Sequence, residues 1–159
     1  KRGPTGVKEL NDTLRPVMNP QGVKLPGVMF LTGDRVIQTR NNYKLKIFNG
    51  DIGVVTGATS THLQVRFDED IEYPKEDLLD LQLAYALTIH KSQGSEFPVV
   101  IIPIHTTNYM MLKRNLLYTA ITRGKSMVVL IGTQKAINLA IKTTDSSKRY
   151  SNLKGLLNL

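Results

Sequence analysis

The sequence predicts an α/β protein in which a parallel sheet with flanking helices is interrupted by a small all-β barrel. Two patterns favour this fold class. After residue 82, continuous apolar segments alternate with helical segments, which is typical of a parallel sheet covered on both faces. Within residues 28–82, short segments alternate between apolar and polar residues, which is typical of a curled antiparallel sheet. The predicted organisation is therefore an inserted barrel at 28–82, surrounded by one domain made of 1–27 and 83–159.

The first predicted element is an amphipathic helix over residues 5–18, which ends near Pro20. Its apolar residues recur at spacings of three and four: Val7, Leu10, Leu14 and Val17. The Pro- and Gly-rich residues 19–33 follow. Barrel strands are then predicted at 35–39, 53–58 and 63–67, with turn residues at Asn49, Gly50 and 68–70 between them. About five strands of ordinary length fit within the insert.

The surrounding domain continues with alternating strands and helices, and the first helix is expected to pack on its sheet. Strands are predicted at 83–89, 99–104 and 127–131, and helices at 111–123 and 133–143. Residues 145–159 are polar and then weakly amphipathic, which predicts a disordered tail or a segment that docks on a neighbour.

Composition narrows the functional classes. With 159 residues, no cysteine and three scattered histidines, the chain lacks the spacing of a zinc site and the thiols of a disulfide framework. No apolar run reaches the length of a membrane span. The sequence starts on Lys1 without a signal-peptide pattern. These features predict a cytoplasmic piece of a longer protein, with no membrane partner and no structural metal.

The net charge of +8 is unevenly distributed. Residues 68–80 hold seven of the thirteen acids and a single base, Lys75, so 20 bases face 6 acids elsewhere. Such an excess suits a polyphosphate partner, because neutralised phosphates release counterions, but a basic surface can also serve solubility alone.

The segment TIHKSQGSEF, residues 88–97, follows a predicted strand and is rich in small and polar residues. In open α/β sheets, ligands bind beyond the carboxyl ends of strands. Thr88, His90 and Ser92 offer donors to phosphates, Gly94 allows close approach to the backbone, and Glu96 can accept hydrogen bonds from a ribose. The alternative is an ordinary connection whose polar residues bond their own backbone.

The segment LLYTAITRG, residues 116–124, ends a predicted helix whose apolar stripe comprises Leu112, Leu116 and Ala120. Gly124 is a natural stop for this helix. Arg123 at its end is either a partner of the helix dipole or an arginine finger that reaches a γ-phosphate. An arginine finger is worth about a thousandfold or more in rate, which corresponds to about 4 kcal/mol or more. A contact with the helix dipole contributes less, under about 1 kcal/mol.

Two other segments imitate nucleotide motifs. Gly3 and Gly6 with Lys8 resemble a phosphate loop but lack its spacing. Asp68 and Glu69 resemble the acidic end of a magnesium-binding strand, but the preceding strand alternates, which indicates a solvated turn.

TIHKSQGSEF at 88–97 resembles motif V, and LLYTAITRG at 116–124 resembles motif VI, of superfamily 1 helicases of the RecD/TraA type. KRGPTGVKELNDTLRPVMNP at the start resembles the motif IV region, and GDRVIQTRNNY with FNGDIG resembles the start of the inserted barrel of that family. The resemblance implies a second RecA-like domain interrupted by a Src-homology-3-like barrel, from a bacterial ATP-dependent DNA helicase that moves 5′ to 3′ on single-stranded DNA. The phosphate loop and the Mg2+ ligands are then expected on an N-terminal RecA-like domain outside this sequence.

The resemblance also assigns residues. It implies Arg123 as the arginine finger, with Arg2, Gly94 and Glu96 on the nucleotide side. Thr88, His90 and Lys91 are expected to contact the single strand. Recombination or repair proteins are implied as possible partners. Two other classes of function stay open: a stand-alone nucleic-acid-binding module, and a protein-interaction domain that uses the acidic edge at 68–80.

Overall fold

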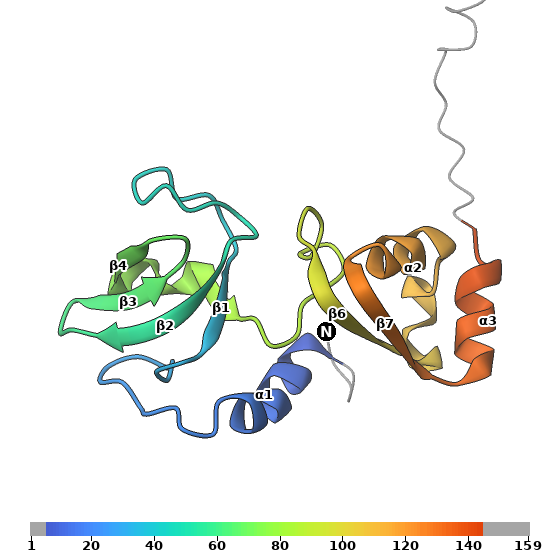
Figure 1. Ribbon diagram of the computed structural model, residues 1–159, viewed down its shortest axis with the longest axis horizontal. Helices are drawn as coiled ribbons and strands as arrows, with labels where there is room; N and C mark the ends of the chain where they lie inside the picture. The colour runs from blue at the N-terminus through green and yellow to red at the C-terminus, as the bar shows by residue number, and fades with distance from the viewer. Residues whose placement is uncertain (1–5, 145–159) are drawn as a thin grey trace, which may run out of the picture. The chain divides into compact units, whose positions relative to one another are not determined.

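The computed structural model describes residues 6–144 and divides the chain into two compact units, 1–97 and 98–159 (Figure 1). The first unit contains one α-helix, five strands and a short 3-10 helix. In chain order these are α1 (Val7–Met18), β1 (Arg35–Gln38), β2 (Ile52–Ala58), β3 (His62–Arg66), β4 (Asp70–Pro74), η1 (Lys75–Asp80) and β5 (Leu81–Leu83).

The five strands form one antiparallel sheet in the order β4-β3-β2-β1-β5. This confirms the predicted strands at 35–39, 53–58 and 63–67 and the predicted number of strands. Thr56 is an extra residue in β2, because Val55 pairs with Val65 while Gly57 pairs with Gln64. Such a bulge bends the strand and helps the sheet to curl.

The curled sheet encloses the core of the first unit. In β2 and β3 alternate residues are buried, as the period of two requires, whereas β1 buries three consecutive residues. The core comprises Phe30, Val36, Ile47, Val55, Leu63, Val65, Tyr73 and Leu81. Tyr73 is buried together with its hydroxyl, which donates a hydrogen bond of 3.0 Å to Gln38.

Helix α1 confirms the predicted amphipathic helix, and Pro16 is accommodated in its last turn. The residue that α1 buries is polar, however: Asn11 is buried, whereas Val17 at the end of the predicted stripe is 72% exposed. The prediction that α1 covers the parallel sheet stays a prediction.

The strand predicted at 83–89 is wrong. β5 ends at Leu83 and belongs to the barrel sheet, where it pairs with β1. The chain bends after Leu83, and its hydrogen-bond partner there is a side chain: Asn11 accepts hydrogen bonds from the amides of Tyr85 and Ala86, at 2.8 and 3.0 Å, and donates one to the Ala86 carbonyl at 2.9 Å. The backbone groups are thus satisfied without a strand partner.

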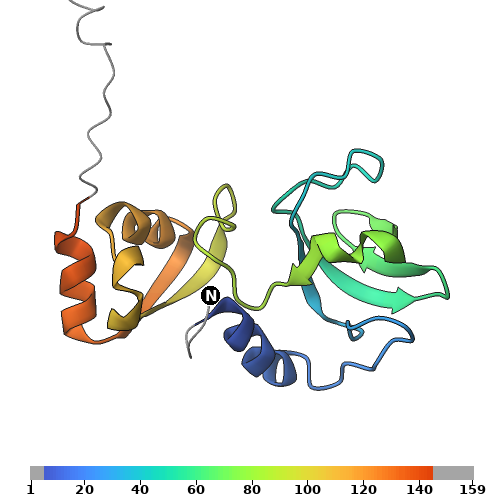
Figure 2. The ribbon, with the colours of Figure 1, turned by 180° about the vertical axis from the view of Figure 1, so that it is seen from behind.

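The second unit contains β6 (Phe97–Ile104), η2 (Thr106–Met111), α2 (Arg114–Ile121), β7 (Gly124–Gly132) and α3 (Gln134–Lys142), which Figure 2 shows from behind. β6 and β7 form a two-stranded parallel sheet, with Gly132 at the end of β7 packed closely on the Ile104 carbonyl at the end of β6. The strands predicted at 99–104 and 127–131 and the helix predicted at 133–143 are confirmed.

The helix predicted at 111–123 is shorter than expected. Met111 ends the 3-10 helix η2, Lys113 is extended, and α2 begins only at Arg114. No Pro or Gly marks this break, so helical periodicity alone does not reveal it. The tail at 145–159 and Arg2 lie outside the described residues. Within the described part of the chain, no helix has the length and hydrophobicity needed to cross a membrane.

Candidate functional site

The loop at 88–96 begins as a single tight turn that its own residues stabilise. The Ser92 amide donates to the Thr88 carbonyl at 3.1 Å, and the Lys91 amide donates to the Thr88 hydroxyl oxygen at 3.2 Å. Thr88 therefore caps the turn, as Thr does at the start of a helix. Ser92 is buried and its hydroxyl donates to the Ile89 carbonyl at 2.8 Å, so it bonds the backbone of its own loop, and its role as a donor to phosphates stays a prediction.

The second half of the loop exposes backbone. Gly94 has a φ of +85°, which L side chains rarely adopt, and a methyl group built on it meets no atom within 4 Å. A ligand can therefore approach the main chain closely at this position. Glu96 and His90 are exposed, and Glu96 directly precedes β6.

Lys91 is the cation of this loop, and it is tied to the barrel. Its ammonium group donates a hydrogen bond of 2.7 Å to the Gln82 side chain on β5. Partial burial lowers the pKa of Lys91, because desolvation disfavours the charged form. A phosphate contact would require this ammonium group to turn away from Gln82 or to bind both partners.

Arg123 follows α2 directly and is half-buried. Its Nε donates to the Thr119 carbonyl at 3.2 Å, and its Nη2 donates to the Thr122 hydroxyl at 3.3 Å. The guanidinium group thus lies over the carboxyl end of α2, where helix carbonyls attract a cation. It is not enclosed in an apolar core.

The helix α2 ends before Gly124, as predicted, but Gly124 is not its cap and has no positive φ. Thr122 caps the helix in a right-handed conformation, and Gly124 starts β7. A Cβ at Gly124 would lie 2.5 Å from Val128 Cγ2, so close packing is what requires glycine here.

The structure therefore brings Thr88, His90, Lys91, Gly94 and Glu96 together in one loop of the first unit. Arg123 belongs to the second unit, and Arg2 lies outside the described residues. Asn11, which fixes the approach to this loop, was missed by the sequence analysis, because an Asn inside an amphipathic helix gives no signal of a long-range partner.

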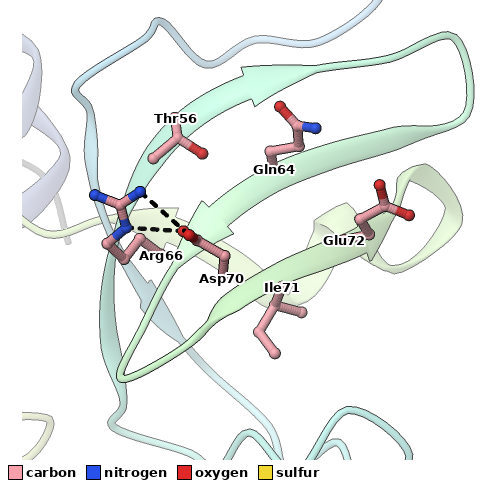
Figure 3. A pocket seen from close by; sticks show the side chains of 6 residues that line it. All are labelled: Thr56, Gln64, Arg66, Asp70, Ile71 and Glu72. Carbon is pink, nitrogen blue, oxygen red and sulfur yellow. Dashed lines mark hydrogen bonds and ion pairs between the residues drawn. The ribbon is translucent and has the colours of Figure 1, made fainter.

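A pocket of about 350 Å³ lies elsewhere, on the outer surface of β2, β3 and β4 (Figure 3). Its lining residues are Thr56, Gln64, Arg66, Asp70, Ile71 and Glu72. Arg66 and Asp70 form an exposed ion pair at 2.8 Å, and the hydrogen bond from Arg66 lowers the pKa of Asp70. None of the predicted site residues lines this pocket. The predicted turn at Asp68 and Glu69 is confirmed as an exposed connection between β3 and β4.

Two protein families match the sequence in separate segments. Residues 83–131 match the UvrD-like helicase C-terminal domain, a segment that contains the whole 88–96 loop and Arg123. Residues 10–67 match the ATP-dependent RecD-like DNA helicase SH3 domain, from α1 through β3. Together the two matches make the chain similar to the C-terminal region of RecD-like helicases, from residue 10 to residue 131.

Curated relatives agree with this assignment. The chain is 40% identical over 143 residues to the ATP-dependent RecD2 DNA helicase of Deinococcus radiodurans, covering 88% of this chain and 20% of that protein. It is 34% identical over 143 residues to the RecBCD enzyme subunit RecD of Mycolicibacterium smegmatis, covering 89% of this chain and 26% of that protein. The chain thus spans about a fifth to a quarter of the length of these relatives.

Solved structures resemble this chain in fold. A structure of Pif1 helicases that unwind forked double-stranded DNA matches with a TM-score of 0.55 and 23% identity, over 79% of this chain and 37% of that chain. Pif1 helicase from Bacteroides in complex with ADP-AlF3 and single-stranded DNA matches with a TM-score of 0.55 and 21% identity, over 85% of this chain and 39% of that chain. At these identities the likeness concerns the fold alone.

Proposed function

We propose that this chain is the part of an ATP-dependent DNA helicase that supplies the arginine finger and a loop that contacts single-stranded DNA. The observation that carries the proposal is the position of Arg123, directly after α2 within the segment that matches the helicase C-terminal domain, with a guanidinium group outside the apolar core. In this proposal, residues 1–27 and 83–159 form the second RecA-like domain, and 28–82 form the inserted barrel.

The residues of the chain take distinct roles in this function. Arg123 stabilises the charge that develops on the γ-phosphate, a task for which a guanidinium group is well suited. Gly94 and Glu96 face the nucleotide, and the open backbone at Gly94 fits a bound phosphate or ribose. Thr88, His90 and Lys91 face the single strand. Arg2 is the proposed second arginine near the γ-phosphate and lies outside the described residues.

The bound ATP supplies the phosphoanhydride whose hydrolysis drives the cycle. Its phosphate loop and Mg2+ ligands belong, in this proposal, to a first RecA-like domain, as the family resemblance implies. Arg123 must leave Thr119 and Thr122, or extend beyond them, to reach a phosphate across the domain boundary. This rearrangement ties closure of the two domains to catalysis.

The 88–96 loop is proposed to couple that closure to the strand, since one short segment carries both sets of residues. The proposed direction of movement, 5′ to 3′ on single-stranded DNA, follows the family resemblance. Proteins of recombination or repair are the proposed partners, because several relatives are named as subunits of the RecBCD enzyme. A cytoplasmic location accords with such a role.

The test is an Arg123→Ala substitution in the helicase that contains this region. The ATPase kcat should fall about a thousandfold, because a finger acts in the transition state, while the affinity for single-stranded DNA is retained. Arg114→Ala is the matched control: Arg114 is the cation at the start of α2, and its guanidinium group donates to the Ile141 carbonyl at 2.8 Å. An equal fall of the ATPase kcat in Arg123→Ala and Arg114→Ala would refute the assignment of Arg123 as the arginine finger. A parallel loss of affinity for single-stranded DNA in Arg123→Ala would refute it as well.

A second candidate function, a stand-alone nucleic-acid-binding module, is favoured by the loop between β1 and β2. Tyr43 and Phe48 are 75% and 47% exposed there, and their rings pack edge to face, 6.2 Å apart. Exposed cations flank them, namely Arg40, Lys44 and Lys46. Aromatic rings beside cations form stacking platforms for single strands.

This candidate predicts that the 159-residue chain binds a fluorescent oligonucleotide by itself, with an affinity that falls as salt is raised. Tyr43→Ala should weaken the binding about tenfold, because a base loses its stacking surface. Tyr109→Ala removes an equally exposed ring from η2 and serves as the control. Absence of binding at low salt excludes the module and leaves the helicase proposal untouched. Binding that survives Tyr43→Ala instead points to a different surface.

A further inference from the structure

The carboxylate of Asp34 is the most densely bonded buried group in the described residues. It is fully buried and lies one residue before β1, where the chain enters the barrel. Arg15 of α1 donates to both of its oxygens. Further donors are the Asn19 side chain at 3.1 Å, the Leu31 amide at 2.8 Å and the Tyr85 hydroxyl at 3.0 Å.

These bonds join the two ends of the barrel to α1. Arg15 and Asn19 come from the helix, Asp34 stands where the barrel begins, and Tyr85 stands two residues after β5 ends. Burial and the hydrogen bond to Asp34 raise the pKa of Tyr85, so the hydroxyl stays a donor at neutral pH.

The hydrogen bonds around Asp34 are a first tie between α1 and the barrel ends. A second tie, made by Asn11, lies one residue further along the chain than Tyr85, at Ala86. The side-chain amide of Asn11 bonds both the N–H and the C=O of Ala86, as a neighbouring strand would do. Ala86 precedes Thr88, the residue that caps the turn of the 88–96 loop, by only two positions. Asn11 therefore fixes the direction in which the chain enters that loop.

A third tie returns from the loop to the barrel. The Lys91 ammonium group donates to Gln82 on β5, so the loop is held at its start by α1 and in its middle by the barrel sheet. The three ties enclose a segment of ten residues, from 82 to 91.

We infer that four residues are positioning residues that join the barrel, α1 and the 88–96 loop into one body: Asn11, Asp34, Tyr85 and Gln82. A force on the barrel is then transmitted to the loop and changes its conformation. Its consequence for activity rests on the proposed function, because that proposal places the strand and the nucleotide on this loop. The barrel then acts on the site through hydrogen bonds within its own unit.

The deciding measurement is amide hydrogen exchange of the 159-residue chain by NMR. Tyr85→Phe removes only the hydroxyl that bonds Asp34. It should accelerate exchange of the Lys91, Ser92 and Ser95 amides roughly tenfold, as expected for loss of a hydrogen bond to a charged group. Tyr73→Phe is the matched control, since it also deletes a single hydrogen-bonded tyrosine hydroxyl, here one that is fully buried and bonded to Gln38 inside the barrel. That control should leave the three loop amides unchanged.

Gln82→Ala is the second variant. It is an exposed substitution that removes the third tie without touching the buried network, and it should loosen the same amides. Unchanged loop exchange in Tyr85→Phe and Gln82→Ala, or an equal change in Tyr73→Phe, overturns the inference.

A functional measurement separates positioning from mere stability. In the helicase that contains this region, Tyr85→Phe should lower the DNA-stimulated kcat several-fold with little change in the KM for ATP. Loss of stimulation in Tyr73→Phe to the same degree would contradict a positioning role. If Arg123→Ala leaves ATP hydrolysis intact, the proposed function fails, whereas the exchange data still decide whether barrel and loop are one body.

Discussion

Replacement of Asp34 by alanine should strongly destabilise the first unit. The substitution removes the acceptor of every bond in the network around this carboxylate and leaves the Arg15 guanidinium group without its anion. Removal of one member of a buried ion pair typically costs about 3–5 kcal/mol. The Arg15 side chain retains 20% exposure, so water can solvate it in part, and the expected loss is about 3 kcal/mol. That is a large share of the roughly 5–15 kcal/mol that stabilises a typical domain.

Urea denaturation of the 159-residue chain, followed by circular dichroism, measures this loss. Asp34→Asn keeps the shape of the side chain but replaces one acceptor oxygen by an NH2 group, which then faces other donors. The free energy of unfolding of Asp34→Asn should fall by less than that of Asp34→Ala, but by more than about 1 kcal/mol. A loss below about 1 kcal/mol in Asp34→Ala would show that the carboxylate does not hold α1, the barrel and Tyr85 together.

Three further substitutions test other parts of the structure. Gly94→Ala should cost about 1–2 kcal/mol in urea denaturation through its left-handed backbone alone, because no atom lies near the added methyl group; a neutral result would contradict the positive φ. Thr133→Ala should destabilise the second unit by about 1 kcal/mol in thermal melts, since its hydroxyl oxygen caps α3 by accepting from the Ala136 amide, and an unchanged melt would rule out that cap. Burial raises the pKa of Tyr73 above its ordinary value of 10.0, so the stability linked to its neutral form is complete below that pH and is lost as the pH rises further. Denaturation between pH 9 and 11 should therefore show a shallower alkaline decline for Tyr73→Phe than for the wild type, and identical declines would refute the burial of this hydroxyl.

Local patterns account for the elements that were predicted correctly. The barrel strands alternate with a period of two, and the strands β6 and β7 are apolar and bounded by turns or helices, so short-range sequence suffices to find them. Motif order and spacing likewise predict the helicase-like segments around Thr88 and Arg123 from the sequence alone. These features depend on residues that are neighbours along the chain.

The errors arose where distant residues replace a local partner. The strand predicted at 83–89 ends at Leu83 because Asn11, more than seventy positions earlier, bonds the backbone at Tyr85 and Ala86. The need for glycine at position 124 was missed for a different reason: Val128 lies only four residues away, but a steric contact with it cannot be seen in a helix-stop pattern.

The sequence by itself determined the fold class, the barrel strands and the relation to RecD-like helicases, because periodicity and motifs are written in consecutive residues. Only the tertiary structure decided which side chains hold the 88–96 loop and the ends of the barrel. The physical reason is that buried polar groups must find hydrogen-bond partners, and the fold, not the order of residues, brings Asn11, Asp34 and Tyr85 within bonding distance.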